Sequence, residues 1–247
     1  MHADEWFKIW FSSPYYDILY KKRDKEEAER LIDALVNYLE IPQHSFILDA
    51  ACGKGRHSVA FAAKGFDVTG IDICVAAITE AKKYESENLH FYLHDMRLPF
   101  YINYFNYAFN FFTSFGYFRT MREHNDAMRT IAQSLRPNGV FTIDYLNVDY
   151  TEKNLSPSDT IEADDVLFEI ERWFDDAYFY KRINVTDKQK NIHESFTERV
   201  EKFTLKDFTN MLSLQGLQIE NVFGDYDLHQ YDEKESARMI IVAGKAH

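Results

Sequence analysis

Apolar positions along residues 24–147 alternate between two patterns, short continuous runs and stripes with helical spacing. The continuous runs cover 46–50, 66–72, 89–95, 105–112 and 140–146. Runs of this length predict buried strands. Apolar residues three or four positions apart predict helices between them, as at Ala127, Met128 and Ile131. Strands that alternate with helices favour a parallel sheet covered on both faces, so we expect a doubly wound α/β sheet up to about residue 150.

The segment before the first strand contains a predicted helix over residues 24–40. Asp24 and Glu27 have the spacing of a capping pair, and Leu31 and Leu35 fall on one apolar face. We assign residues 1–45 to an N-terminal helical cover and 46–150 to the core of the sheet.

The pattern changes after residue 150. Three strand-like runs follow, at 165–174, 177–185 and 193–203, and no helical stripe lies between them. Strands joined by short polar links are typical of an antiparallel meander. We therefore expect an inserted β meander, or lid, over residues 151–203.

The last segment, 204–247, contains a predicted helix from Thr204 to about Gln215 and two strand-like runs, 217–227 and 237–246. The short link between the runs predicts an antiparallel pair at one edge of the sheet. These assignments describe one domain over residues 1–247.

Composition narrows the class of protein. The chain has 247 residues, of which 46% are hydrophobic and 28% charged, and these shares are typical of a globular protein. The formal net charge is −12 and basic residues do not cluster, which disfavours a nucleic-acid partner. We find no apolar run of membrane-spanning length and no signal peptide. Cys52 and Cys74 fit neither a disulfide framework nor a metal motif, so we predict a cytoplasmic protein without a metal. The sequence indicates no particular oligomeric state.

Candidate chemistry begins with the stretch "ILDAACGKGRHS" at 47–58. A strand that ends at Asp49 leads through a turn of small residues, Ala51, Gly53 and Gly55, into a helix. Such a turn leaves backbone N–H groups free at the helix start and lets a ligand approach closely. The same turn also occurs without a ligand.

Acidic residues at the next two strand ends strengthen the case for a ligand. Asp72 lies 17 residues after Gly55, and an acid at about this distance from a glycine turn accepts hydrogen bonds from ribose hydroxyls. Asp95 ends the third strand. Both acids are expected at the carboxyl edge, where open α/β sheets bind ligands.

These residues carry a family resemblance. The stretches "ILDAACGKGRHS", "VTGIDI", "HDMR", "FTSFGYF", "SLRPNGVFTIDYLN" and "GDYD…RMIIVAGKA" resemble the class I, Rossmann-like S-adenosylmethionine-dependent methyltransferases. The likeness is strong over about 45–147 and weaker over 204–245. It implies a seven-stranded, mostly parallel sheet whose last strand is reversed, and it implies S-adenosylmethionine as the cofactor.

The resemblance also implies a role for each matching position. Those that would surround the cofactor are Asp49, Ala51 and Gly53 at its methionine half, Asp72 at the ribose, Ile73, Asp95 and Met96 at the adenine, and Asn110 near the sulfonium. The stretch "WFSSPYYDILYKKRD" at 10–24 resembles the N-terminal cover of a bacterial branch of the family, in which Tyr20 or Arg23 would bind the cofactor carboxylate.

The residues that bind the methyl acceptor are predicted only as a group, without a separate role for each. Five residues are expected to line a substrate pocket: Tyr16, Phe115, Tyr117, Tyr145 and Asn147. His57, in the first turn of a helix, is either a general base or, as we favour, a structural hydrogen-bonding group. We identify no residue as catalytic.

A small-molecule acceptor is the favoured substrate. The fourth strand continues as "NFFT" and not as the Asn/Asp-Pro-Pro-aromatic sequence of enzymes that methylate nucleobase and amide nitrogens. The inserted meander resembles the segment that roofs the pocket in small-molecule branches of the family. Attack by oxygen and attack by nitrogen both stay open.

Two other functions compete with methyl transfer. Ser58, three residues after Gly55, leaves the dinucleotide fingerprint of an NAD(P)-dependent oxidoreductase possible. The absence of a second domain, the acid at Asp95 and the terminal strand pair favour methyl transfer. The second alternative is a non-catalytic protein that binds S-adenosylmethionine.

Overall fold

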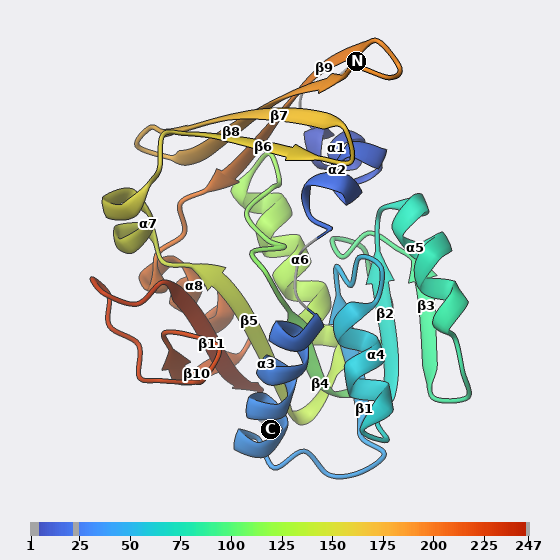
Figure 1. Cartoon of the computed structure of the whole chain (residues 1–247). Coiled ribbons are helices and arrows are strands. Elements are labelled where there is room, and N and C mark those ends of the chain that lie inside the picture. The colour runs from blue at the N-terminus through green and yellow to red at the C-terminus, as the bar shows by residue number, and fades with distance from the viewer. Residues whose placement is uncertain (1–4, 22–24, 246–247) are drawn as a thin grey trace.

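The computed structural model describes residues 5–21 and 25–245, which form two separate sheets and the helices that pack on them (Figure 1). Within these residues the larger sheet has seven strands in the order β10-β11-β5-β4-β1-β2-β3. They are β1 (Phe46–Ala50), β2 (Asp67–Asp72), β3 (Leu89–Leu93), β4 (Phe105–Asn110), β5 (Leu135–Leu146), β10 (Leu217–Phe223) and β11 (Arg238–Lys245).

One strand of this sheet runs against the others. The pairs β1–β2, β1–β4, β2–β3 and β4–β5 are parallel, whereas β11 is antiparallel to both β5 and β10. The predicted α/β sheet with a reversed last strand is therefore confirmed. Because β11 is reversed, its first residue, Arg238, pairs with Leu146 at the end of β5. Arg238 thus lies at the carboxyl edge of the parallel strands.

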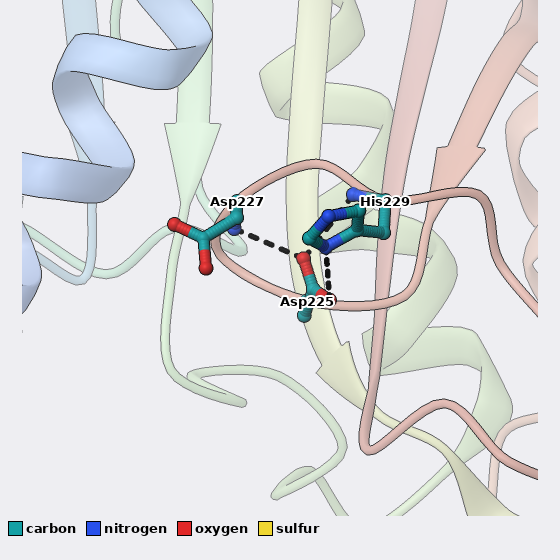
Figure 2. A group of neighbouring side chains, drawn as sticks. All are labelled: Asp225, Asp227 and His229. Atoms are coloured by element: carbon teal, nitrogen blue, oxygen red, sulfur yellow. Dashed lines mark hydrogen bonds and ion pairs between the residues drawn. The ribbon is translucent and has the colours of Figure 1, made fainter.

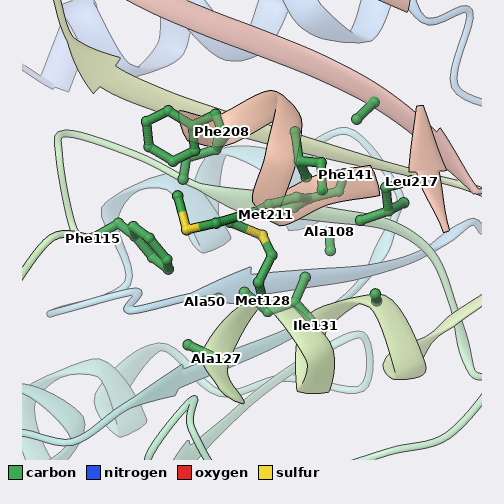
Figure 3. Packing of buried hydrophobic residues seen from close by; sticks show 14 of the residues in the cluster. Ala50, Ala108, Phe115, Ala127, Met128, Ile131, Phe141, Phe208, Met211 and Leu217 are labelled. Carbon is green, nitrogen blue, oxygen red and sulfur yellow. The ribbon is translucent and has the colours of Figure 1, made fainter. Parts of the chain in front are cut away.

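Helices cover both faces of this sheet. They are α3 (Lys25–Tyr38), α4 (Arg56–Ala63), α5 (Val75–Ala81), the 3-10 helix η2 (Lys82–Tyr84), α6 (Met121–Ser134) and α8 (Leu205–Ser213). Apolar residues of α3, α4 and α5 form one buried cluster with the sheet, and those of α6 and α8 form another. Figure 3 shows the second cluster, in which Met128 of α6 and Met211 of α8 meet beside Phe141.

The smaller sheet, named here the cap sheet, is inserted between β5 and α8. It contains β6 (Ser158–Ala163), β7 (Val166–Phe174), β8 (Tyr178–Asp187) and β9 (Ile192–Glu201), paired antiparallel in that order. The predicted meander is present and has one more strand than expected. The pattern also failed to predict α7 (Val148–Asn154), which has no buried residue.

The N-terminal helices join the cap sheet to the rest of the molecule. Trp10 of α1 (Trp6–Phe11) and Tyr15, in α2 (Pro14–Leu19), form a third buried cluster with Phe168, Ile183 and their neighbours in the cap sheet. The segment predicted as a helical cover contains α1, α2 and α3, of which α1 and α2 pack on the cap sheet and α3 packs on the larger sheet. Asp24, the expected capping residue of α3, lies outside the described residues.

Candidate functional site

A cavity of about 690 Å³ lies at the carboxyl edge of the larger sheet. Its walls come from α1 and α2, from the loop after β1, from the ends of β2 and β3, and from the loop after β4. The cap sheet contributes Glu198, and the turn between β6 and β7 contributes Asp164. The cavity therefore brings together segments that are distant in the sequence.

The loop after β1 has an unusual backbone. Ala51, Gly53 and Gly55 have φ angles of 62°, 56° and 82°, in the left-handed region that favours glycine. A Cβ added at Gly55 would lie 2.5 Å from the ring of Phe91, so this glycine allows α4 to approach the sheet. A Cβ added at Gly53 would meet no atom within 4 Å. Gly53 lines the cavity, so the loop offers a ligand an open stretch of backbone.

Asp72 connects this loop to the next one. Its carboxylate accepts hydrogen bonds from the backbone N–H of Gly53 and of Cys74, both at 2.8 Å. Burial raises the pKa of Asp72, and the two backbone donors oppose that shift. The side chain lines the cavity at the end of β2, the place expected for a group that binds ribose.

Asp49 and Asn110 lie beside the loop but not on the cavity surface. The hydroxyl of Ser58 donates to Asp49 at 2.5 Å, and burial raises the pKa of Asp49 to about 6, with a further contribution from the charge of Asp72. Asn110 Nδ2 donates to the backbone oxygen of Ala50 at 2.9 Å. Its Oδ1 is buried and has no hydrogen-bond partner among the described residues.

The adenine-side predictions Ile73, Asp95 and Met96 all line the cavity. Arg97 donates to both carboxylate oxygens of Asp95, from Nε at 3.0 Å and from Nη2 at 2.6 Å. Burial opposes ionisation of Asp95, but these bonds outweigh it and hold the pKa of the carboxyl below its ordinary value. Arg97 therefore fixes the orientation of the acid at the end of β3.

The loop after β4 is held by a partly buried ion pair that the sequence did not reveal. Phe112 and Thr113 have φ angles of 56° and 58°, which are strained for residues with side chains. Asp144 accepts from Phe112 N at 2.8 Å and pairs with Arg238, at 2.7 Å from its Nη2. Arg238 Nη2 also donates to Thr113 Oγ1 at 2.9 Å. These bonds stabilise the loop that forms one wall of the cavity.

His57 lines the cavity and packs against the rings of Phe111 and Phe112, with centroid distances of 4.8 and 5.2 Å. Burial, with a smaller contribution from Arg56, lowers the pKa of His57 to about 3. An imidazole with such a pKa accepts protons poorly near neutral pH. This disfavours the general-base role. The hydrogen-bonding role is not seen at Nε2, which is buried and has no hydrogen-bond partner among the described residues, so ring packing is the contact that the structure shows for His57.

The aromatic wall contains two of the five predicted substrate residues. Tyr16 and Tyr117 line the cavity together with Phe11, and their rings contact that of Phe11 at centroid distances of 5.1 and 5.8 Å.

The other three predicted substrate residues point elsewhere. Phe115 is fully buried in the cluster of α6 and α8 (Figure 3). The Tyr145 hydroxyl donates to the backbone oxygen of Glu201 at 2.5 Å, and Asn147 Nδ2 donates to the backbone oxygens of Glu233 and Ser236 at 2.8 Å. Their placement corrects the prediction, because core packing and loop hydrogen bonds occupy these side chains.

The two residues predicted for the cofactor carboxylate have different outcomes. Tyr20 lines the cavity, and its hydroxyl donates to Glu198 Oε1 at 3.1 Å and accepts a hydrogen bond from Lys181. The hydroxyl proton is therefore directed to the cap sheet. Arg23 lies outside the described residues.

An acidic turn lies after β10. Asp225, Asp227 and His229 bring oxygen and nitrogen atoms close enough to hold a metal ion (Figure 2). Asp225 already accepts hydrogen bonds from the backbone N–H of Asp227 at 3.0 Å, from that of His229 at 3.2 Å and from His229 Nδ1 at 2.8 Å. These contacts explain the geometry as a turn, and we assign no metal site to it.

The comparisons with known proteins identify the family. The model of the family described as "Methyltransferase domain" matches residues 20–222. The chain belongs to this family. As a member it is an S-adenosylmethionine-dependent methyltransferase, and this membership favours methyl transfer over the nicotinamide-dependent alternative.

Curated proteins that are similar in sequence include the following two. A putative methyltransferase, YqeM, of Bacillus subtilis is 24% identical over 225 residues, covering 85% of this chain and 87% of that protein. The dTDP-3-amino-3,4,6-trideoxy-alpha-D-glucopyranose N,N-dimethyltransferase of Streptomyces venezuelae is 31% identical over 132 residues, covering 52% of this chain and 54% of that protein.

Solved structures share the fold. A S-adenosylmethionine-dependent methyltransferase from Clostridium acetobutylicum superposes with a TM-score of 0.77 at 18% identity, covering 94% of this chain and 96% of that one. The sugar N-methyltransferase KedS8 from a Streptoalloteichus species superposes with a TM-score of 0.73 at 21% identity, covering 94% of this chain and 93% of that one.

None of the helices over residues 5–21 and 25–245 has the length and apolarity that crossing a bilayer requires.

Proposed function

We propose that this methyltransferase acts on a small-molecule acceptor held between the carboxyl edge of the larger sheet and the cap sheet. The observation that carries the proposal is the cavity of about 690 Å³. Its walls come from the loops after β1, β2 and β3, from the N-terminal helices and from the cap sheet. Its volume is within the range of about 300–1,000 Å³ that is usual for small-molecule sites. The chain's net charge of −12 disfavours a nucleic-acid acceptor.

The described residues suit the cofactor at one end of this cavity. We assign Asp72 to the ribose hydroxyls, the loop of Ala51 and Gly53 to the methionine half, and Ile73 and Met96 to the flanks of the adenine. The open space above Gly53 supports close approach of a ligand to the backbone. Asp95 is assigned to the adenine amino group because it lines the cavity in an orientation fixed by Arg97.

Asp49 and Asn110 are assigned to the surroundings of the charged methionine end. The unpartnered Oδ1 of Asn110 offers an acceptor for an N–H group. Asp49 is buried and acts from behind the loop, where its negative charge favours a positively charged ligand.

Bound S-adenosylmethionine supplies a sulfonium that makes its methyl group reactive. The chain's own residues then have to orient the acceptor in line with the methyl–sulfur bond and exclude water. The aromatic wall, which includes Tyr16 and Tyr117, is suited to both tasks. A general base is needed only for an acceptor that begins protonated.

The relatives make a sugar the leading acceptor class. The Streptomyces venezuelae protein is an N,N-dimethyltransferase of an amino sugar, and KedS8 is a sugar N-methyltransferase. The location in the cytoplasm stays a prediction.

The test is a product assay with the purified protein and S-adenosylmethionine. We expect S-adenosylhomocysteine and a methylated product with members of a panel of nucleotide-linked amino sugars, neutral sugars and phenols. The Asp72→Ala variant is the matched control for turnover that depends on the cofactor site. Turnover that occurs only with nucleic acid or protein substrates would contradict the proposal.

A further inference from the structure

Glu198 is the residue of β9 that lines the cavity. It lies on the inner face of the cap sheet, the face on which Phe196 packs against Trp10 with a ring centroid distance of 4.7 Å. The side chain of Glu198 is 18% exposed. A carboxylate so far from bulk water is costly unless it is hydrogen-bonded, so its contacts indicate what it does.

The described hydrogen bonds of this carboxylate are both made by one oxygen. Oε1 accepts from Trp10 Nε1 at 2.7 Å and from the Tyr20 hydroxyl at 3.1 Å, and Lys181 Nζ lies 3.8 Å from it. Among residues 5–21 and 25–245, no hydrogen bond to Oε2 is seen. The side chain is thus fixed through one oxygen, and the second has capacity for further hydrogen bonds.

Charge in the rest of the cavity favours a positively charged partner for Glu198. The cavity-lining cations Lys21 and Lys54 are paired, with Asp164 at 2.8 Å and with Asp17 at 2.6 Å respectively. The third lining cation, Arg56, lies over the ring of Phe112 at 4.7 Å. Carboxylates outnumber these three cations in the lining, which disfavours an anionic acceptor; they are Asp17, Asp72, Asp95, Asp164 and Glu198. A carboxylate with an uncommitted oxygen binds an ammonium group more strongly than a hydroxyl, since both members of the hydrogen bond are charged.

From these observations we propose that Glu198 Oε2 binds the amino group of the acceptor, and that the acceptor of this methyltransferase is an amine. The bound ammonium first releases one proton to solvent, because only the neutral amine has a lone pair. That lone pair then forms the nitrogen–methyl bond while the methyl–sulfur bond breaks and its electrons stay on sulfur. The inference rests on the proposed function and extends it, because it decides between nitrogen and oxygen acceptors and names the residue that distinguishes them. Trp10 and Tyr20 act as positioning residues that hold Glu198 in place.

Three cyclic probes of similar size test the inference without knowledge of the natural acceptor: cyclohexylamine, cyclohexanol and cyclohexanecarboxylate. Each is titrated into the protein saturated with S-adenosylhomocysteine, and binding is followed by ligand-observed NMR. We expect cyclohexylamine to bind about tenfold more tightly than cyclohexanol, as a charge-assisted hydrogen bond predicts, and cyclohexanecarboxylate to bind least.

Variants separate contact with the amine from support of the fold. Glu198→Gln should reduce the preference for the amine to threefold or less. Trp10→Phe removes a donor to Oε1 and should retain most of the preference. Glu171→Gln is the matched control, because Glu171 is on an exposed part of the same sheet and pairs with Arg182 at 3.1 Å. If Glu198 only joins α1 to the cap sheet, Glu198→Gln and Trp10→Phe should change the preference for cyclohexylamine over cyclohexanol equally.

Titrations of the wild-type protein alone already test whether the acceptor is an amine. Absence of amine binding, or equal affinity for amine and alcohol, would overturn the inference, as would an unchanged preference in Glu198→Gln. Calorimetry with S-adenosylhomocysteine on the same samples tests the proposed function separately. Failure of that binding contradicts the cofactor site, whereas cofactor binding without an amine preference contradicts only the role of Glu198.

Discussion

Replacing Asp72 with alanine tests the link between the loops that follow β1 and β2. The carboxylate accepts two backbone hydrogen bonds of 2.8 Å, from Gly53 and Cys74, and thereby connects two cavity loops. Hydrogen bonds to a charged acceptor contribute about 1.5–3 kcal/mol each. Water partly replaces them because the residue is half-buried, so we expect the free energy of unfolding to fall by about 2–3 kcal/mol.

Cofactor affinity should fall as well. Loss of the charged acceptor for the ribose hydroxyls costs about 1.5–3 kcal/mol, which corresponds to roughly a 10- to 150-fold increase in the Kd for S-adenosylhomocysteine. Isothermal titration calorimetry measures the Kd, and urea unfolding measures stability.

Asp67→Ala is the matched control, because Asp67 begins the same strand at the opposite edge of the sheet. It should leave the Kd unchanged. A folded Asp72→Ala protein with wild-type affinity would refute the role of Asp72 in binding the ribose.

Three further predictions concern the surroundings of the cofactor loop. The pKa of Asp49, about 6 against an ordinary 3.8, means that the folded protein holds a proton that the unfolded chain releases. The free energy of unfolding should therefore fall as pH rises from about 4 to 6, by at most about 3 kcal/mol. Urea unfolding at several pH values measures this slope, and an equal slope of the free energy of unfolding against pH in wild type and Asp49→Asn would contradict the prediction. Gly55→Ala, whose Cβ would meet Phe91 at 2.5 Å, should lower the free energy of unfolding by about 2–4 kcal/mol. Gly53→Ala should lower it by only about 1 kcal/mol and should mainly weaken cofactor binding. Urea unfolding measures the stability and calorimetry measures the binding, and similar losses of stability in the two variants would refute the distinction. Arg238→Met should lower the free energy of unfolding by about 3 kcal/mol and weaken cofactor binding, because it leaves the Asp144 carboxylate without its ion-pair partner beside the loop after β4. Additive effects of Arg238→Met and Asp144→Asn on stability in a double-mutant cycle would show that the two residues are not coupled.

Local sequence patterns predicted the larger sheet well, together with two acids that line the cavity at its carboxyl edge. The apolar runs predicted the parallel strands, and the positions of Asp72 and Asp95 at strand ends placed both acids in the cavity. These predictions succeed because a strand end and a turn are determined by residues close in the sequence.

Features that depend on side-chain direction were predicted poorly. Tyr145 and Phe115 follow or end strands near the ligand edge, yet both side chains turn into the core beside Phe208. A position near the end of a strand fixes the edge but not the direction in which the chain next turns. Strand β6 was missed because its sequence, SDTIEA, has no buried residue to produce an apolar pattern.

Contacts between distant segments were beyond any local pattern. Phe112 and Thr113 adopt left-handed backbone angles that their residue types do not suggest, and Arg238 supports them from the far end of the chain. Glu198 likewise enters the cavity only because the cap sheet folds back over α1 and α2.

A crystal structure of the complex with S-adenosylhomocysteine tests the central claim most directly. We predict that the adenosyl group lies in the cavity, with its ribose hydroxyls within hydrogen-bonding distance of Asp72 and its adenine beside Asp95. An adenosyl group bound elsewhere, or a ribose that makes no contact with Asp72, would contradict the account.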